Sequence, residues 1–127
     1  MHLQEHVEVR DGIYRLRLSG ECSLIEAVEL ITDEIAFCRD RGAAKLLVEA
    51  TGLIGVSIPS LVDRFLIAEE WAQEAEGMVI VVLVVQPEYI HPEKFGVRVA
   101  ADFGLTLDVY TSETEAMKWL ASHVHST

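Results

Sequence analysis

The side chains that most often carry chemistry in proteins are few and widely spaced in this chain. The two cysteines, Cys22 and Cys38, form no CxxC pair and no metal-type spacing. None of the histidines stands in an HExxH pattern or near a carboxylate at a zinc-ligand spacing; they are His2, His6, His91, His123 and His125. We therefore predict no metal site, no disulfide framework and no resident cofactor.

Motifs for nucleophilic catalysis and for nucleotide binding are missing from the sequence as well. There is no GxSxG elbow to present a reactive serine. The segment 51–55 follows a predicted strand, but it has neither GxGxxG nor a glycine before Lys-Ser or Lys-Thr. Cys38 falls on the apolar stripe of a predicted helix, where a thiol acts as a small hydrophobe. The sequence predicts a protein that is not an enzyme.

The net charge of the chain limits the classes of partner that it can bind. Ten Lys and Arg stand against 21 Asp and Glu, a formal net charge of −11. Such a charge repels phosphate backbones and anionic lipid headgroups, which excludes nucleic acid as the expected partner. The longest apolar run, 78–85, is too short to span a membrane as a helix. The polar first ten residues do not resemble a signal peptide, and we expect a cytoplasmic protein.

The elements that must position any site follow from the hydrophobic pattern. Asp11-Gly12 joins two predicted strands, 7–10 and 13–18, as an antiparallel hairpin. Three further strands are predicted at 45–50, 78–85 and 105–110. Helices are expected from Ser23 to Gly42, from Pro59 or Ser60 onward, from about Pro92 to Gly104, and after Ser112. The order ββαβαβαβα predicts one α/β domain over 1–127, a mixed sheet with an antiparallel hairpin edge, parallel strands and about four helices.

The second helix carries more large apolar side chains than one buried face needs. Helical spacing assigns its inner face to Leu61, Phe65, Ala68 and Ala72. It leaves Ile67 and Trp71 on one flank beside Arg64, and Leu66 on the other. Trp with Arg is typical of protein contacts, so Arg64, Ile67 and Trp71 are predicted to bind a protein partner or a second copy, as a homodimer. The alternative is a wide buried face under a neighbouring helix.

A second kind of function is also consistent with these elements. Apolar helices over an apolar sheet can leave a pocket for a small lipophilic ligand. The residues expected to line it are Leu53, Ile54, Phe65 and Phe103. A carrier or sensor of such a ligand is therefore the alternative to a protein-binding module.

The order of the elements, with the closing segments 92–96, 104–105 and 113–120, resembles the STAS domain, and within it the SpoIIAA-like proteins. The resemblance covers nearly the whole chain. It implies a STAS-like fold and a non-catalytic, regulatory role in protein binding, as in the anti-sigma-factor antagonists. The helix start at Ser60 and the loop before it are then the expected working region.

The family's phosphorylation switch is not carried over intact. Its regulatory loop aligns with 48–52, so Thr51 and Gly52 are predicted loop residues. The Asp of the family's Asp-Ser pair then falls on Ser57, and the phosphorylated serine falls on Ile58, which has no hydroxyl. Ser57 or Ser60 remains an alternative phosphate acceptor at the helix start, although helix capping alone explains both serines.

Overall fold

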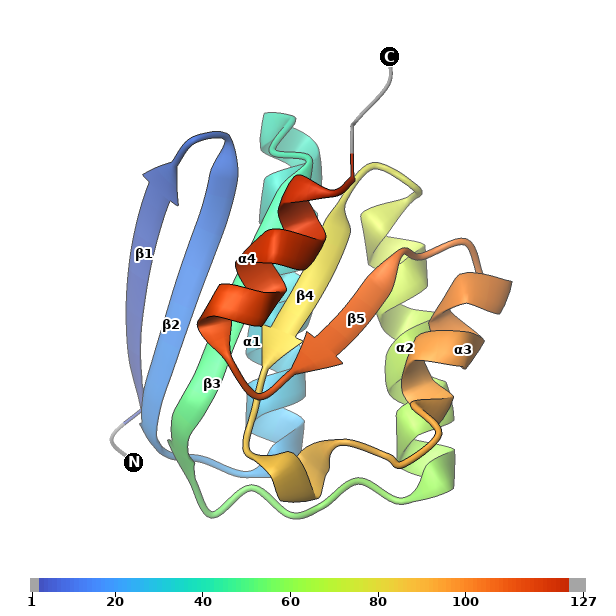
Figure 1. Ribbon diagram of the computed structural model, residues 1–127. Coiled ribbons are helices and arrows are strands. Elements are labelled where there is room, and N and C mark those ends of the chain that lie inside the picture. The colour runs from blue at the N-terminus through green and yellow to red at the C-terminus, as the bar shows by residue number, and fades with distance from the viewer. Residues whose placement is uncertain (1–2, 124–127) are drawn as a thin grey trace.

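The computed structural model describes residues 3–123 as a five-stranded sheet between two layers of helices (Figure 1). The strands are β1 (Gln4–Arg10), β2 (Ile13–Glu21), β3 (Lys45–Ile54), β4 (Ile80–Val84) and β5 (Leu107–Tyr110). They lie side by side in the order of the sequence. β1 is antiparallel to β2, and the other neighbours are parallel. The predicted mixed sheet with an antiparallel hairpin edge is confirmed.

The helices are divided unequally between the two faces of the sheet. α1 (Leu24–Arg41), α2 (Leu61–Ala75) and α3 (Phe95–Asp102) lie behind the sheet in Figure 1, and α4 (Glu113–Ala121) lies in front. A short 3-10 helix, η1 (Pro87–Tyr89), connects β4 to α3. Right-handed crossovers between strands in sequential order place their helices on one face, which explains the layer of three.

Each face of the sheet has its own core. The larger one lies under α1, α2 and α3 and includes Leu16, Ile35, Leu46, Trp71, Val81 and Leu105. The smaller one lies under α4 and includes Ile13, Leu47, Val82, Val84, Ala116 and Leu120. Alternate residues of β3 and β4 enter opposite cores, because successive side chains in a strand point to opposite faces.

Local sequence signals set most of the boundaries. Ser23 and Ser60 each cap a helix in a reciprocal capping box, with Glu26 and Asp63 respectively. Ser112 caps α4, and Gly42 ends α1 in the left-handed conformation with φ 71°. These predicted helix ends are confirmed, because each depends on hydrogen bonds within one turn of chain.

The third strand is longer than predicted. Thr51 and Gly52 belong to β3 rather than to a loop, because β2 also runs on to Glu21 and pairs with the end of β3. The register shifts between Arg17 and Ser19, after which Ser19 pairs with Gly52. A Cβ atom at Gly52 would lie 3.0 Å from the Cβ of Ser19, so the close approach of these strands depends on glycine.

The third helix and the last strand begin later than predicted. Lys94 has a left-handed backbone with φ 50°, and its amide donates to the carbonyl of His91, so a turn precedes α3. Phe103 stands at the C-cap of α3 and is exposed. β5 begins at Leu107 instead of residue 105.

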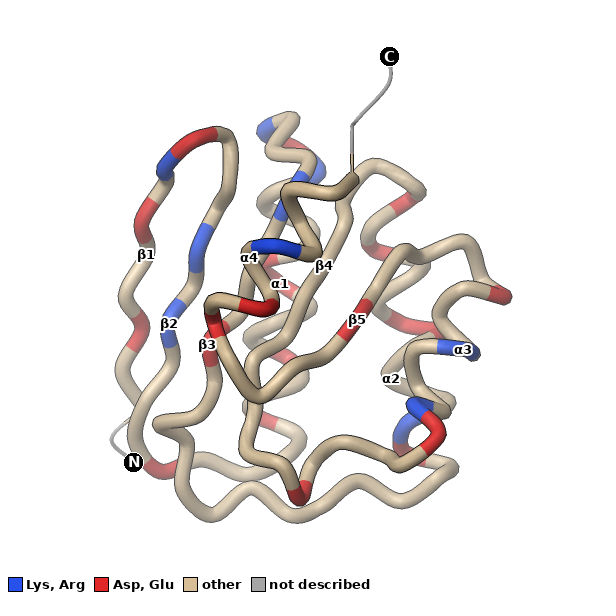
Figure 2. Tube along the Cα trace, in the orientation of Figure 1, with Lys and Arg blue, Asp and Glu red and all other residues tan. Residues whose placement is uncertain are grey.

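Acidic residues occur on all four α-helices and on every strand except β4 (Figure 2). Within residues 3–123, no helix combines the length and the apolar character needed to cross a membrane. No group of three potential metal-ligating side chains occurs in this part of the chain either. His2 and His125 lie outside the described residues.

Candidate functional site

The buried face of α2 differs from the predicted one. Ala68, Trp71, Ala72 and Ala75 are buried, whereas Leu61 and Phe65 are 54% and 40% exposed. α1 and α3 pack along the two sides of α2, and the small alanines allow this close approach. The predictions that Leu61 and Phe65 lie inward and that Trp71 lies on an exposed flank are therefore wrong.

Trp71 is held firmly between two helices. Only 4% of its surface is exposed. Its indole Nε1 donates to Oγ1 of Thr32 on α1 at 3.0 Å, and that hydroxyl donates in turn to the carbonyl of Val28 at 2.7 Å. A buried indole whose N–H is hydrogen-bonded serves the packing of α2 against α1. This agrees with the alternative that the sequence left open, a wide buried face under a neighbouring helix.

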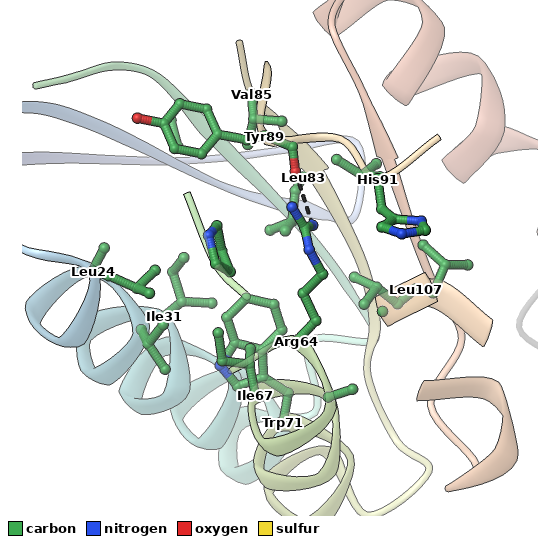
Figure 3. A pocket seen from close by; sticks show the side chains of 18 of the residues that line it. Leu24, Ile31, Arg64, Ile67, Trp71, Leu83, Val85, Tyr89, His91 and Leu107 are labelled. Atoms are coloured by element: carbon green, nitrogen blue, oxygen red, sulfur yellow. Dashed lines mark hydrogen bonds between the residues drawn. The ribbon is translucent and has the colours of Figure 1, made fainter. Parts of the chain in front are cut away.

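A pocket of about 160 Å³ lies between α1, α2 and the sheet (Figure 3). It is partly open to solvent, and most of the residues lining it are apolar, among them Leu24, Ile31, Ile67, Trp71, Leu83 and Leu107. β3 and β4 reach it near their carboxyl ends with Leu53 and Leu83, and β5 reaches it with Leu107 and Val109. The carboxyl end of a parallel sheet is where α/β proteins usually bind ligands.

The pocket combines two sites that the sequence analysis kept apart. Leu53 lines it as predicted, but the residues beside it are Arg64, Ile67 and Trp71, which were assigned to a protein contact. The other predicted lining residues lie elsewhere: Ile54, Phe65 and Phe103 are exposed and do not line the pocket. The periodicity of α2 was correct, but its rotation about its axis was not predictable from α2 alone.

Arg64, from α2, is a cationic side chain among the residues that line this apolar pocket (Figure 3). Its Nη1 donates to the carbonyl of Tyr89 on η1 at 3.0 Å. It forms no ion pair with any residue from 3 to 123. Burial without a neighbouring anion lowers the pKa of the Arg64 guanidinium, although arginine remains charged.

The other polar side chains at the pocket already have partners. Nζ of Lys94 lies 2.6 Å from Oδ1 of Asp108 and also stands over the ring of Tyr110. Nδ1 of His91 accepts from the backbone amide of Glu93 at 3.1 Å. The hydroxyl of Tyr89 donates to the carbonyl of Val56 at 2.6 Å. These contacts leave Arg64 as the charged group of the pocket without a counterion.

The residues of the predicted regulatory region do not form a single site. The amide and hydroxyl of Thr51 both donate to the carboxylate of Glu49 within β3. Ser60 uses its hydroxyl as the N-cap of α2, with Asp63 as the reciprocal partner. Ser57 and Ile58 are exposed in the loop between them. Ile58 has an aliphatic side chain, which offers no hydroxyl for phosphorylation.

An exposed apolar surface lies on the side of α2 that faces away from the pocket. It is formed by Leu61, Val62, Phe65 and Leu66, which we call the α2 patch. The ring of Phe65 packs edge-on against that of Phe103, with centroids 5.7 Å apart. This patch was not predicted, because Leu61 and Phe65 were assigned to the buried face. The position of Leu66 outside that face was the one indication of it in the sequence.

The α2 patch continues into a shallow groove toward α1. Leu66 and Ile25 contribute apolar walls to the groove. Three carboxylates also line it: Glu29 of α1, and Asp63 and Glu70 of α2. The surface is thus apolar at its centre and acidic beside it.

No protein-family model matches the chain, and no curated protein matches it. Solved structures do. An anti-sigma factor antagonist from Mycobacterium paratuberculosis superposes with a TM-score of 0.58 at 15% identity, covering 94% of this chain and 95% of the other. The unphosphorylated anti-sigma factor antagonist SpoIIAA gives 0.53 at 20% identity, covering 94% and 100%. An uncharacterised protein with a SpoIIAA-like fold from Shewanella loihica gives 0.50 at 17%, covering 93% of each chain.

These similarities extend over whole chains while the sequences have diverged. The chain therefore has the SpoIIAA-like, STAS-like fold, and the resemblance stated from the sequence is confirmed at the level of the fold. Function resides in particular sites rather than in a fold.

Proposed function

We propose that the protein is a non-catalytic regulatory module that binds a protein partner through the α2 patch. The observation that carries this proposal is the exposure of four large apolar side chains at the start of one helix, Leu61, Val62, Phe65 and Leu66. Contiguous apolar surface of this kind is typical of interaction sites. The SpoIIAA-like fold, found in two anti-sigma factor antagonists, supports a regulatory role for the protein as a whole.

The charge around the patch favours a basic partner. Glu29, Asp63 and Glu70 border the groove beside Leu66, and the whole chain carries a net charge of −11. A partner with an apolar anchor and flanking Lys or Arg side chains would complement both features. A homodimer would bring two strongly acidic surfaces together, so a different, basic protein is the favoured occupant.

The proposed regulation does not use the family's phosphoserine position, where Ile58 stands. The hydroxyl of Ser60 is already engaged as the cap of α2 with Asp63, so phosphorylation there would exchange the capping hydrogen bond for phosphate contacts with the amides of the helix start. Ser57 remains the accessible hydroxyl of the loop. Two free, buried cysteines suit a reducing compartment, and we propose that the protein acts in the cytoplasm.

Affinity capture with matched variants tests the proposed surface. Leu66→Glu places a charge in the α2 patch, and Val9→Glu places one on β1, at the far edge of the sheet, where Val9 is 68% exposed. A true partner from the cell lysate is retained equally by wild type and Val9→Glu, and at least tenfold less by Leu66→Glu. Equal retention by all three baits would refute the proposal. Light scattering of the same proteins identifies a second copy as the occupant if Leu66→Glu alone halves the mass.

A second candidate function rests on the pocket. Its apolar lining and its position near the carboxyl ends of β3 and β4 support a carrier or sensor of a small lipophilic ligand. Solvent extraction of the purified protein, followed by mass spectrometry, is the direct test. One stoichiometric small molecule supports this function, and an Ile67→Trp variant that fills the pocket should lose it.

A further inference from the structure

We infer that the pocket between α1, α2 and the sheet binds a small monocarboxylate with a compact apolar tail, and that Arg64 binds its carboxylate. This inference deepens the second candidate function and rests on it. None of the four residues of the α2 patch lines this pocket, and Ile67 lies between the pocket and the groove beside Leu66.

The size of the pocket limits the tail. A dry apolar cavity of about 150 Å³ accepts a molecule of the size of benzene. The pocket of about 160 Å³ therefore accommodates a six-membered ring or a short chain within its apolar lining. The rigid ring of Trp71, fixed through Thr32, forms one wall for such a tail.

The guanidinium of Arg64 has the donors that a carboxylate requires. Nη1 is bound to the carbonyl of Tyr89, which orients the planar group. Nε and Nη2 donate to no other residue among 3–123, and together they present two parallel N–H groups. A carboxylate accepts such a pair in a bidentate arrangement. It would also supply the counterion that a half-buried cation otherwise lacks.

The local charge favours a single negative charge on the ligand. Lys94 is engaged by Asp108, and His91 accepts a hydrogen bond from the amide of Glu93. One unpaired cation balances a monocarboxylate but leaves a phosphate monoester with excess negative charge. In a chain with a net charge of −11, that excess is unfavourable.

Benzoate and benzyl alcohol form a matched pair of probes, because they share a ring and differ in charge. Binding is measured by titration calorimetry and by the fluorescence of Trp71 in a Trp119→Phe background. We expect saturable benzoate binding that is at least tenfold tighter than binding of benzyl alcohol. Arg64→Gln should weaken benzoate binding at least tenfold and change benzyl alcohol binding less than twofold. Arg98→Gln, which removes an exposed arginine of α3, should change neither.

The outcomes separate this inference from the function on which it rests. Equal affinities for the two probes would overturn the role of Arg64 while leaving an apolar ligand site. Absence of saturable binding for either probe would overturn both. Thermal unfolding checks that Arg64→Gln folds. If it does not, Arg64→Lys retains the charge without the paired donors, and unchanged benzoate affinity in that variant would contradict the bidentate contact.

Discussion

Trp71 joins α1 to α2 and forms a wall of the pocket, so its truncation should affect stability before it affects binding. We expect Trp71→Ala to lower the free energy of unfolding by about 3–5 kcal/mol, as other buried large-to-small changes do. Phe65→Ala, at an exposed position of the same helix, should cost about 1 kcal/mol or less. Urea denaturation measures both. A Trp71→Ala protein as stable as Phe65→Ala would contradict the burial of the indole.

Glu34 should make the free energy of unfolding decrease as the pH rises, whereas a carboxylate with a lowered pKa makes it increase. Burial raises the pKa of its carboxyl above the ordinary 4.5, the neighbouring hydroxyl of Tyr14 opposes this shift, and the charges of Glu5 and Asp33 add to it. Its buried Oε2 has no hydrogen-bond partner within the described chain. The folded state therefore holds a proton that the unfolded state releases, and this contribution to stability is lost as the pH rises from about 4.5 through the folded-state pKa.

Glu34→Gln tests this assignment. The variant should have a larger free energy of unfolding than wild type at pH 7. The difference should disappear below pH 4, where the carboxyl of Glu34 is protonated in both the folded and the unfolded state. Thermal unfolding at the two pH values measures it. Glu29→Gln, at an exposed position of the same helix, serves as the control. A difference between Glu34→Gln and wild type that does not vary with pH would contradict the raised pKa.

At the scale of the element, the hydroxyl of Ser60 determines where α2 begins. Ser60 accepts from the amide of Asp63 at 3.1 Å, and the carboxylate of Asp63 accepts from the amide of Ser60 at 2.9 Å. Ser60→Ala should therefore destabilise the protein by about 1 kcal/mol. Ser57→Ala, three residues earlier in the exposed loop, should leave the free energy of unfolding unchanged. Denaturation of the two variants decides it, and equal effects would show that Ser60 does not act as the cap.

The strands β2 and β3 depend on a close approach that only glycine permits. A Cβ at Gly52 would meet Ser19 Cβ at 3.0 Å and the carbonyl of Leu18 at 3.2 Å. Gly52→Ala should lower the thermal midpoint. Gly96→Ala, where the nearest atom would be 3.8 Å away, should preserve or raise it, since alanine favours the helix. A Gly52→Ala protein that melts at the wild-type temperature would contradict the close pairing at this point.

Elements defined by local interactions could be predicted from the sequence. The Asp11-Gly12 turn and the caps at Ser23, Ser60 and Ser112 each depend on a few neighbouring residues. The extension of β3 could not be predicted, because it requires β2 to continue and shift its register. The rotation of α2 likewise depends on α1 and α3 packing against its sides.

At the scale of the whole molecule, the arrangement of layers creates both proposed sites. Three helices on one face leave a pocket beside α2, and Leu61, Val62, Phe65 and Leu66 of the same helix remain exposed. The sequence analysis predicted that the second helix carries the function and that Arg64, Ile67 and Trp71 contact a partner. It could not show which side each residue occupies, since Phe65 and Trp71 are both large, aromatic and apolar.

The central claim is that α2 binds a protein with its outer side. Photo-crosslinking in living cells tests it directly, with a photoreactive amino acid placed singly at positions 62, 66, 71 and 9. We predict a crosslinked partner of the same size at Val62 and Leu66, which are exposed on the patch, and none at the buried Trp71 or at Val9 on β1. Crosslinking through position 71, or equally through position 9, would contradict the account.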